Sequence, residues 1–241
     1  MQAVLAPFKV IWLAFWLIVF SLILFFPVMV AALAARTGRV AFFLMQSWAW
    51  LMLRVFFVRV KIRGRENVKP GQGYVILSNH RSLLDVPALV TSLGVPYRWV
   101  IKKELRAIPL FGQALAASRN IFIDRSNGKK AMQTIQKGVA QLPPGTGVLF
   151  FPEGRISPDG RMLPFKRGAF VTARNSGLPV LPVTVIGSRQ CLRRGSVVFQ
   201  PGTITVVIHP PIDVNTIQSE SLEALMERTK HIISCAEHST E

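Results

Sequence analysis

The chain has 241 residues, which is enough for one sizeable hydrophobic core and a smaller appendage. Its 29 Lys and Arg against 12 Asp and Glu give a formal net charge of +17, which favours polyanionic partners such as nucleic acid, anionic lipid headgroups or phosphorylated substrates. Two cysteines, Cys191 and Cys235, are too few for a disulfide framework and lack the CxxC or Cys/His spacing of a zinc site, so we expect a reducing compartment and no bound metal.

The first 65 residues combine long apolar runs with eight basic residues and no acidic one, a pattern that suits a membrane surface better than a nucleic acid. Residues 10–35 carry no charge over 26 positions. As a helix this run would be about 39 Å long, against about 30 Å for the hydrocarbon core of a bilayer. A cleaved signal peptide is the alternative, because "ALA" at 32–34 resembles a cleavage site. The run is too long for a signal peptide, however, and a second apolar run follows it.

The second run, residues 40–53, is uncharged over only 14 positions, or about 21 Å of helix, which is too short to span a bilayer unaided. The turn "RTGR" at 36–39 predicts a hairpin that either spans the bilayer or lies in one leaflet. Arg54 would be costly at mid-depth, which favours one leaflet. Residues typical of the headgroup boundary occur in both runs: Trp12, Trp16, Trp48 and Trp50.

From Val58 the pattern changes to short strands and amphipathic helices, so we expect a membrane-associated hairpin over residues 1–56 and an α/β domain over 57–241. The predicted strands are 58–63, 74–78, 97–101, 120–123, 147–151, 180–186, 196–199 and 203–208. The predicted helices are 82–93, 129–142, 166–175 and 219–238. Their alternation predicts an α/β fold with a mixed sheet flanked by helices.

The segment "NHRSLLD" at 79–85 places a histidine and an aspartate five positions apart, just after an apolar run. On one helix they would lie about 140° apart around the axis, so they can meet only if a helix boundary separates them. Ser82 predicts that boundary as the N-cap of a helix with Asp85 at N3. His80 then lies on the preceding loop, within reach of Asp85. The pair can be a catalytic dyad, or only a polar loop beside a helix cap. A role for Asp85 in the cap does not exclude a catalytic role, so the two interpretations are compatible.

Five further segments follow in order: "IKKELRAIPLFG" (101–112), "NIFIDR" (120–125), "FPEGRIS" (151–157), "PFKRGAF" (164–170) and "LPVLPVTVIG" (178–187). Together with "NHRSLLD", this ordered set resembles the 1-acylglycerol-3-phosphate (lysophosphatidate) acyltransferase family, over roughly residues 55–210. The resemblance implies a glycerolipid acyltransferase fold and a fatty acyl thioester donor, with no other cofactor. It also implies a helix pair on the cytosolic leaflet, and thus the cytoplasmic face of the inner or plasma membrane.

The resemblance also implies roles for particular residues. The His-x4-Asp pair would be the catalytic dyad, while the Phe-Pro-Glu-Gly block and the arginine block before it would help to bind the acceptor. The family usually has Thr and then Arg after Phe-Pro-Glu-Gly, whereas Arg155 and Ile156 stand here. The arginine that contacts phosphate is therefore either Arg155, displaced by one position, or Arg161. The matching positions are His80, Asp85, Arg125, Glu153 and Gly154.

The chemistry of acyl transfer to an alcohol agrees with these roles, because an alcohol is a poor nucleophile at neutral pH and needs a base beside it. His80 suits that task, and Asp85 would hold its tautomer and stabilise the imidazolium. No GxSxG segment is present, so we expect direct attack by the acceptor. Backbone amides of the helix that begins near Ser82 are candidates for stabilising the oxyanion.

Four basic residues, each beside an apolar strand or turn, predict a phosphate site at one sheet edge: Lys103, Arg125, Arg155 and Lys166. Taken singly, basic residues such as Lys102, Lys129, Lys130 and Arg193 are more often solvated surface charges, whereas the family resemblance favours a binding role for Arg125 and Arg155. Glu153 cannot bind phosphate directly, but it can accept a hydrogen bond from an acceptor hydroxyl or orient an arginine. If it is buried it needs a cationic partner.

The function expected from the sequence is acyl transfer from coenzyme A or acyl carrier protein to the free hydroxyl of 1-acylglycerol-3-phosphate, giving phosphatidate. The expected partners are the lipid acceptor, the thioester donor and an anionic membrane surface. One alternative is an acyltransferase for another lysolipid, such as a lyso-amino-lipid. The other is a membrane-tethered polyanion-binding protein, for which His80, Asp85 and Glu153 would not be needed. No RNA-binding or helix-turn-helix signature is present, so nucleic acid is not expected.

Overall fold

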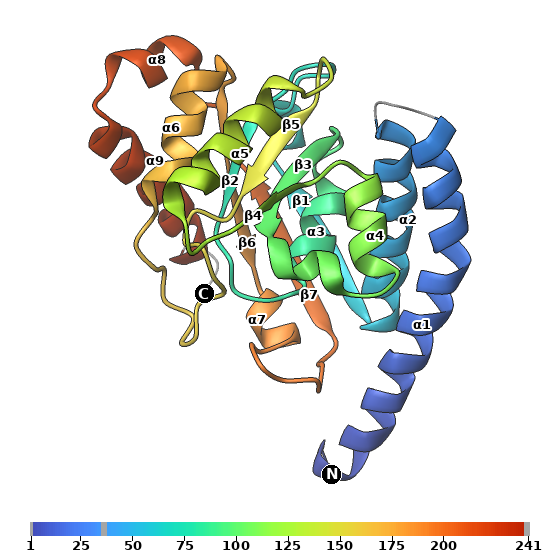
Figure 1. Ribbon diagram of the computed structural model, residues 1–241. Helices are drawn as coiled ribbons and strands as arrows, with labels where there is room; N and C mark the ends of the chain where they lie inside the picture. The colour runs from blue at the N-terminus through green and yellow to red at the C-terminus, as the bar shows by residue number, and fades with distance from the viewer. Residues whose placement is uncertain (1, 35–37, 239–241) are drawn as a thin grey trace.

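The structure is a computed structural model that describes residues 2–34 and 38–238, with side chains described for all of these except 2–6, 32–33 and 238. A seven-stranded sheet lies at its centre, in the strand order β1-β7-β6-β2-β5-β3-β4 (Figure 1). Neighbouring strands are parallel, except that β6 and β7 are antiparallel. The strands are β1 (Val58–Arg63), β2 (Val75–Ser78), β3 (Tyr97–Lys102), β4 (Ile121–Ile123), β5 (Gly147–Phe150), β6 (Val180–Ile186) and β7 (Gly202–Ile208).

Helices cover both faces of the sheet, so the central strands are buried on both sides and their sequences are mainly apolar. Strands β1 and β7 are less enclosed, and their residues alternate between buried and more exposed positions. The helices are α1 (Gln2–Ala34), α2 (Arg39–Val55), η1 (Arg65–Asn67), α3 (Asp85–Ser92), η2 (Lys103–Ala107), α4 (Phe111–Ala117), α5 (Gly128–Ala140), α6 (Arg167–Ser176), α7 (Ser188–Cys191), α8 (Val214–Ser219) and α9 (Leu222–His238).

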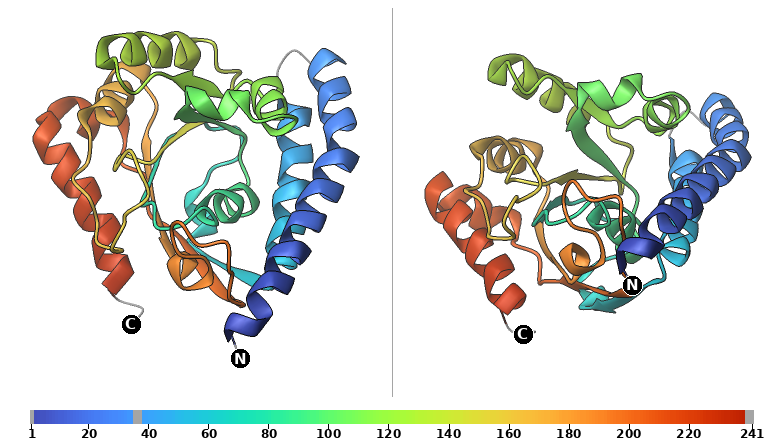
Figure 2. Two further views of the ribbon diagram at one scale, coloured as in Figure 1. Left: turned by 60° about the horizontal axis from the view of Figure 1, so that its bottom comes forward. Right: turned by 90° about the horizontal axis from the view of Figure 1, so that it is seen from below.

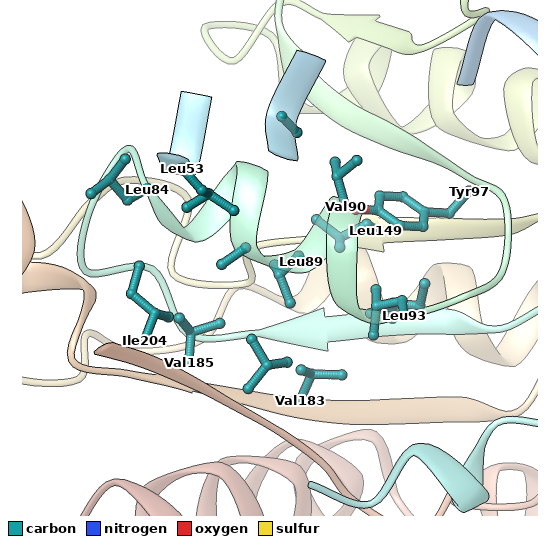
Figure 3. Packing of buried hydrophobic residues seen from close by; sticks show 14 of the residues in the cluster. Leu53, Leu84, Leu89, Val90, Leu93, Tyr97, Leu149, Val183, Val185 and Ile204 are labelled. Carbon is teal, nitrogen blue, oxygen red and sulfur yellow. The ribbon is translucent and has the colours of Figure 1, made fainter. Parts of the chain in front are cut away.

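The core is divided into two layers by the sheet. On one face, α2 and α3 pack over the strands, and Figure 3 shows Leu89 of α3 and Leu93, just after that helix, in one cluster with Leu149 of β5 and Val183 of β6. Full burial of such a leucine contributes about 1.5–3 kcal/mol. On the other face, α5, α6 and α9 pack over Val75 and the alternate residues of the central strands. Helix α9 and the α1–α2 pair therefore flank the sheet on opposite sides (Figure 2).

The mixed α/β sheet flanked by helices is confirmed, and two of the expected elements need correction. No strand forms at 196–199, because Ser196 closes a local turn by bonding both the carbonyl and the amide of Val198. The apolar character of that segment reflects Phe199, which is buried against Phe56. The helix expected over 219–238 begins later, at Leu222, and a separate short helix that was not predicted, α8, precedes it and ends at Ser219.

Helices α1 and α2 form the expected pair, and they differ in how they contact the rest of the protein. Helix α2 contributes Phe42, Ala49 and Leu53 to the core beneath the sheet, so it is part of the same packing unit as the α/β domain. The division at residue 56 remains a prediction. Helix α1 packs along α2 and leaves a row of large apolar side chains exposed: Phe8, Ile11, Phe15, Ile18, Leu22, Ile23, Phe26 and Val30. Within the described residues, one helix is long and apolar enough to cross a membrane, over Pro7–Ala31.

Candidate active site

The segment "NHRSLLD" follows β2, the middle strand of the sheet, so its side chains lie at the carboxyl end of the strands, where open α/β sheets bind ligands. Nδ1 of His80 lies 2.8 Å from Oδ2 of Asp85, which is the expected contact between these side chains. Asp85 is fully buried, and His80 has a side chain that is 13% exposed. The histidine therefore has one edge open to a substrate.

Asp85 is held by the backbone of the loop that precedes it. Its Oδ2 accepts hydrogen bonds from the amides of Arg81 (2.6 Å) and Ser82 (2.8 Å) in addition to its contact with His80. Three partners on one buried oxygen fix the carboxylate, and through it the imidazole. Because Nδ1 of His80 faces this carboxylate, Nε2 is the nitrogen left to accept a proton. Phe151 stacks on the imidazole, with ring centroids 3.8 Å apart, and sets the plane of the ring.

The predicted N-cap at Ser82 is wrong, because α3 begins three residues later, at Asp85. Residues 83 and 84 form a turn in which the Ser82 hydroxyl accepts from the amide of Leu84 (3.2 Å) and donates to the carbonyl of Leu192 (2.7 Å). The half of the capping box that survives is the bond from the Ser82 amide to Asp85. The extra turn still brings Asp85 back towards His80.

Glu153 is buried, and its cationic partner is Arg81, the residue that follows His80. Nη1 of Arg81 donates to both carboxylate oxygens, at 2.7 and 2.9 Å. Oε1 of Glu153 also accepts from the amide of His80 (2.9 Å), and Oε2 accepts from the amide of Leu163 (2.7 Å). The carbonyl of His80 accepts from the amide of Ser157 (3.0 Å). The segment "FPEGRIS" at 151–157 therefore holds both the amide and the carbonyl of His80.

Arg81 is a site residue that the sequence reasoning missed. A signal was available, because a buried glutamate requires a nearby cation and an arginine lies inside the histidine segment itself. Nothing in the spacing of residues 81 and 153, however, indicates that they meet.

Three of the predicted binding residues meet beside the dyad. Nη1 of Arg125 donates to the carbonyl of Gly154 at 2.5 Å, and the alkyl chain of Lys166 lies against Gly154, so that a Cβ added there would be 2.8 Å from Cε of Lys166. Gly154 has φ of +76°, a conformation that a residue with a side chain rarely adopts. These three residues and Phe151 line one open cavity of about 270 Å³. Its other lining residues are mainly apolar and include Ile123, Met132, Ile135 and Phe150.

The other two predicted binding residues lie outside the lining of this cavity. Lys103 forms an exposed ion pair with Asp124 at 2.5 Å. The hydrogen bond to Asp124 and the charge of that carboxylate raise the pKa of Lys103. The hydrogen bond from Lys103 in turn holds the pKa of Asp124 well below its usual range. Arg155 is exposed, directly after Gly154, and within the described residues it forms no hydrogen bond or ion pair. Among the same residues, no three His, Cys, Asp or Glu side chains gather as metal ligands would.

Comparisons with known proteins agree with the geometry. The acyltransferase family model matches residues 59–186. The 1-acyl-sn-glycerol-3-phosphate acyltransferase of Pseudomonas aeruginosa is 36% identical over 197 residues, which are 80% of this chain and 76% of that protein. The chloroplastic 1-acyl-sn-glycerol-3-phosphate acyltransferase BAT2 of Brassica napus is 34% identical over 172 residues, or 70% of this chain, and the match spans about half (49%) of that relative.

The fold is that of a solved relative. The crystal structure of the 1-acyl-sn-glycerophosphate acyltransferase PlsC from Thermotoga maritima superposes with a TM-score of 0.86 at 23% identity, over 99% of this chain and 97% of that one. The family resemblance seen in the motifs is thus confirmed by the family match and by the relatives named above. The chain belongs to the acyltransferase family.

Proposed function

We propose that the chain transfers a fatty acyl group from an acyl thioester to the free hydroxyl of 1-acylglycerol-3-phosphate, giving phosphatidate. The observation that carries the proposal is the 2.8 Å contact between His80 and Asp85 beside a cavity that Arg125 and Lys166 line. The names of the relatives from P. aeruginosa and B. napus support the same acceptor.

In this reaction His80 acts as a general base. Nε2 takes the proton of the acceptor hydroxyl as the hydroxyl oxygen attacks the thioester carbonyl carbon. The carbon–sulfur bond of the resulting tetrahedral intermediate then breaks, and the departing thiolate takes the proton back from the imidazolium. Asp85 stabilises that imidazolium and keeps Nδ1 protonated throughout. Histidine and aspartate thus return to their starting states after each turnover.

Four of the amides at or just before the start of α3, which the sequence suggested for the oxyanion, already have partners within the loop. The amides of Arg81 and Ser82 donate to Asp85, the amide of Leu84 donates to the Ser82 hydroxyl, and the amide of Asp85 donates to the carbonyl of Ser82. These groups instead stiffen the dyad loop, which supports catalysis by preorganisation.

The acceptor phosphate is assigned to the cationic mouth of the cavity. A phosphomonoester carries close to two negative charges at neutral pH, and Arg125 and Lys166 both line the cavity and both contact Gly154. Arg155 follows Gly154 and is free to turn towards the same ligand. Lys103 is paired with Asp124 outside the cavity, so we assign it no direct contact with the phosphate. The donor is a thioester of coenzyme A or acyl carrier protein, and we propose no other cofactor.

Glu153 is assigned to positioning and not to direct acceptor binding. Both of its oxygens are occupied by donors from Arg81, His80 and Leu163, which are buried or partly buried. A hydroxyl of the acceptor would have to displace one of these donors, which would leave it unpaired in the interior.

We assign the protein to the membrane surface, on the cytoplasmic face of the inner or plasma membrane. Helix α2 is anchored in the core along one side, so a bilayer-spanning pair would draw the α/β domain into the lipid with it. A hairpin lying in one leaflet lets the exposed apolar row of α1 enter the lipid alone. Trp50 is exposed beneath the guanidinium of Arg54, 4.8 Å from the ring centroid, a pairing suited to the headgroup layer.

The proposed function is tested with purified protein in detergent, 1-acylglycerol-3-phosphate and a labelled acyl thioester. We expect labelled phosphatidate and one free thiol per product, and both at a rate about 10²- to 10⁴-fold lower from His80→Ala. Product from His80→Ala at the wild-type rate would remove the dyad from the mechanism. If the wild-type protein acylates only a lyso-amino-lipid, or only binds anionic vesicles without turnover, the corresponding alternative takes the place of the proposal.

A further inference from the structure

The last turn of α9 brings a carboxylate to the dyad loop from the far end of the chain. Oε2 of Glu237 accepts from Nη2 of Arg81 at 2.9 Å, and Oε1 accepts from Nδ2 of Asn79 at 2.6 Å. Asn79 and Arg81 are the two neighbours of His80 in the sequence. One side chain, 18% exposed, therefore holds both flanks of the catalytic histidine.

Asn79 shows how strictly this part of the loop is placed. Its side-chain amide donates to the carbonyl of Val185 at 2.8 Å and accepts from the amide of Val185 at 2.7 Å. The side chain thus pairs with β6 as another strand residue would, one position after β2 ends. The second Nδ2 proton is left for Glu237, and this bond ties α9 to the same point.

Arg81 links Glu237 to the dyad. Its guanidinium lies between Glu153 and Glu237, its side chain is only 5% exposed, and its own amide donates to Asp85. Movement of Arg81 would therefore disturb the carboxylate that holds Nδ1 of His80 and the glutamate that holds the amide of His80. The buried positive charge of Arg81 is thus neutralised by two carboxylates, those of Glu153 and Glu237.

The place of Glu237 in its helix favours a role beyond helix stability. A carboxylate in the last turn of a helix faces the negative end of the helix dipole, which disfavours it there. Both of its oxygens are directed to the dyad loop instead of to the helix or to solvent. The residue also lies beyond residues 59–186, so the family match does not include it.

We propose that Glu237 is a positioning residue for acyl transfer, which fixes the dyad loop by holding Asn79 and Arg81 on either side of His80. Helix α9 is then a required part of the active site. In the absence of Glu237 the loop keeps its fold but samples positions in which Nε2 is displaced from the hydroxyl, and a misplacement of about 1 Å costs up to about 10²-fold in rate. This inference rests on the proposed function only for its kinetic readout.

The experiment compares Glu237→Gln and Glu237→Ala with Glu227→Ala in the full-length protein. Gln keeps the length and packing of the side chain but loses the charge and one acceptor. Glu227 lies on the same helix, is exposed, and pairs only loosely with Lys230 at 3.9 Å, so its variant is the matched control. We expect kcat to fall about 10- to 100-fold in both Glu237 variants, with the KM of each substrate within about twofold and the control at wild-type values.

A second readout does not depend on turnover. The chain has four histidines, so the hydrogen-bonded Nδ1 proton of His80 can be assigned in the NMR spectrum by its loss in His80→Ala. We expect this resonance to broaden or vanish in Glu237→Ala and to persist in Glu227→Ala, while the amide spectrum of the sheet is retained. If the resonance and kcat of both Glu237 variants stay at wild-type values, the inference is overturned. If the resonance responds but the wild-type protein acylates no lysolipid, the positioning role stands and the proposed function fails.

Discussion

Replacing Glu153 by Gln tests whether this carboxylate positions the dyad loop or contacts the acceptor. In Glu153, Oε1 accepts hydrogen bonds from His80 and Arg81, and Oε2 accepts from Arg81 and Leu163. Gln has the same length, but its amide nitrogen would face a donor in either orientation. The change also removes one of the two carboxylates that neutralise Arg81. One buried donor is left unsatisfied, and a buried cation keeps a single partner.

The expected loss of unfolding free energy follows from the burial of the Arg81–Glu153 pair. Breaking a buried ion pair by removing one partner costs about 3–5 kcal/mol. The side chains of Arg81 and Glu153 are 5% and 0% exposed, so solvent screening is slight. Because Glu237 remains on Nη2 of Arg81, we expect the lower end, about 3 kcal/mol. For a chain of this size that lowers Tm by about 6–12 °C.

The assay combines thermal unfolding in detergent with steady-state kinetics. We expect Glu153→Gln to lower Tm and to lower kcat by about 10- to 100-fold, because the side chain can no longer accept from the amides of both His80 and Leu163 and loses the charge that holds Arg81, while the KM for lysophosphatidate changes little. Glu104→Gln is the control, since Glu104 is exposed and pairs with Lys102 at 3.4 Å on the surface. A Glu153→Gln protein with unchanged Tm and a strongly raised KM for lysophosphatidate would refute the positioning role and assign Glu153 to the acceptor.

Three further predictions follow from the site and the hairpin. His80→Ala should lower kcat by about 10²- to 10⁴-fold without unfolding the protein, and Asp85→Asn should cost less; a His80→Ala enzyme with near wild-type turnover would contradict the base assignment. Arg125→Lys should raise the KM of the acceptor more than that of the donor, because an ammonium cannot copy the planar fork of a guanidinium, and equal effects on both would count against a phosphate role. A chain that begins at Gly38 keeps α2 in the core and should leave the membrane fraction in high salt, whereas continued sedimentation with membranes would place the anchor elsewhere.

Local pattern was sufficient to predict most of the fold. Alternation at 58–63 and the apolar run at 180–186 gave strands with the bounds that the structure has, because burial on one or both faces is recorded in the period of a strand. The segment at 196–199 misled because a buried aromatic side chain in a loop leaves the same short apolar signal as a strand. A short apolar segment alone does not show whether its buried side chain comes from a loop or from a strand paired in a sheet.

The site was predicted only as far as its contacts are local. The His80–Asp85 contact could be argued from a helix boundary, even though the boundary itself was misplaced at Ser82. The partners of Arg81 come from positions 72 and 156 residues further along the chain, and no spacing rule connects them. Tertiary packing of two loops and the last helix against the end of β2 produces this network, so it becomes visible only in the fold.

The measurement that tests the central claim most directly is the ratio of kcat/KM for lysophosphatidate to that for lysophosphatidylcholine of the same acyl chain. A mouth lined by Arg125 and Lys166 favours a phosphomonoester with close to two negative charges over a headgroup with a compensating cation. We predict a strong preference for lysophosphatidate that weakens in high salt or added phosphate. Equal or faster acylation of lysophosphatidylcholine would contradict the account.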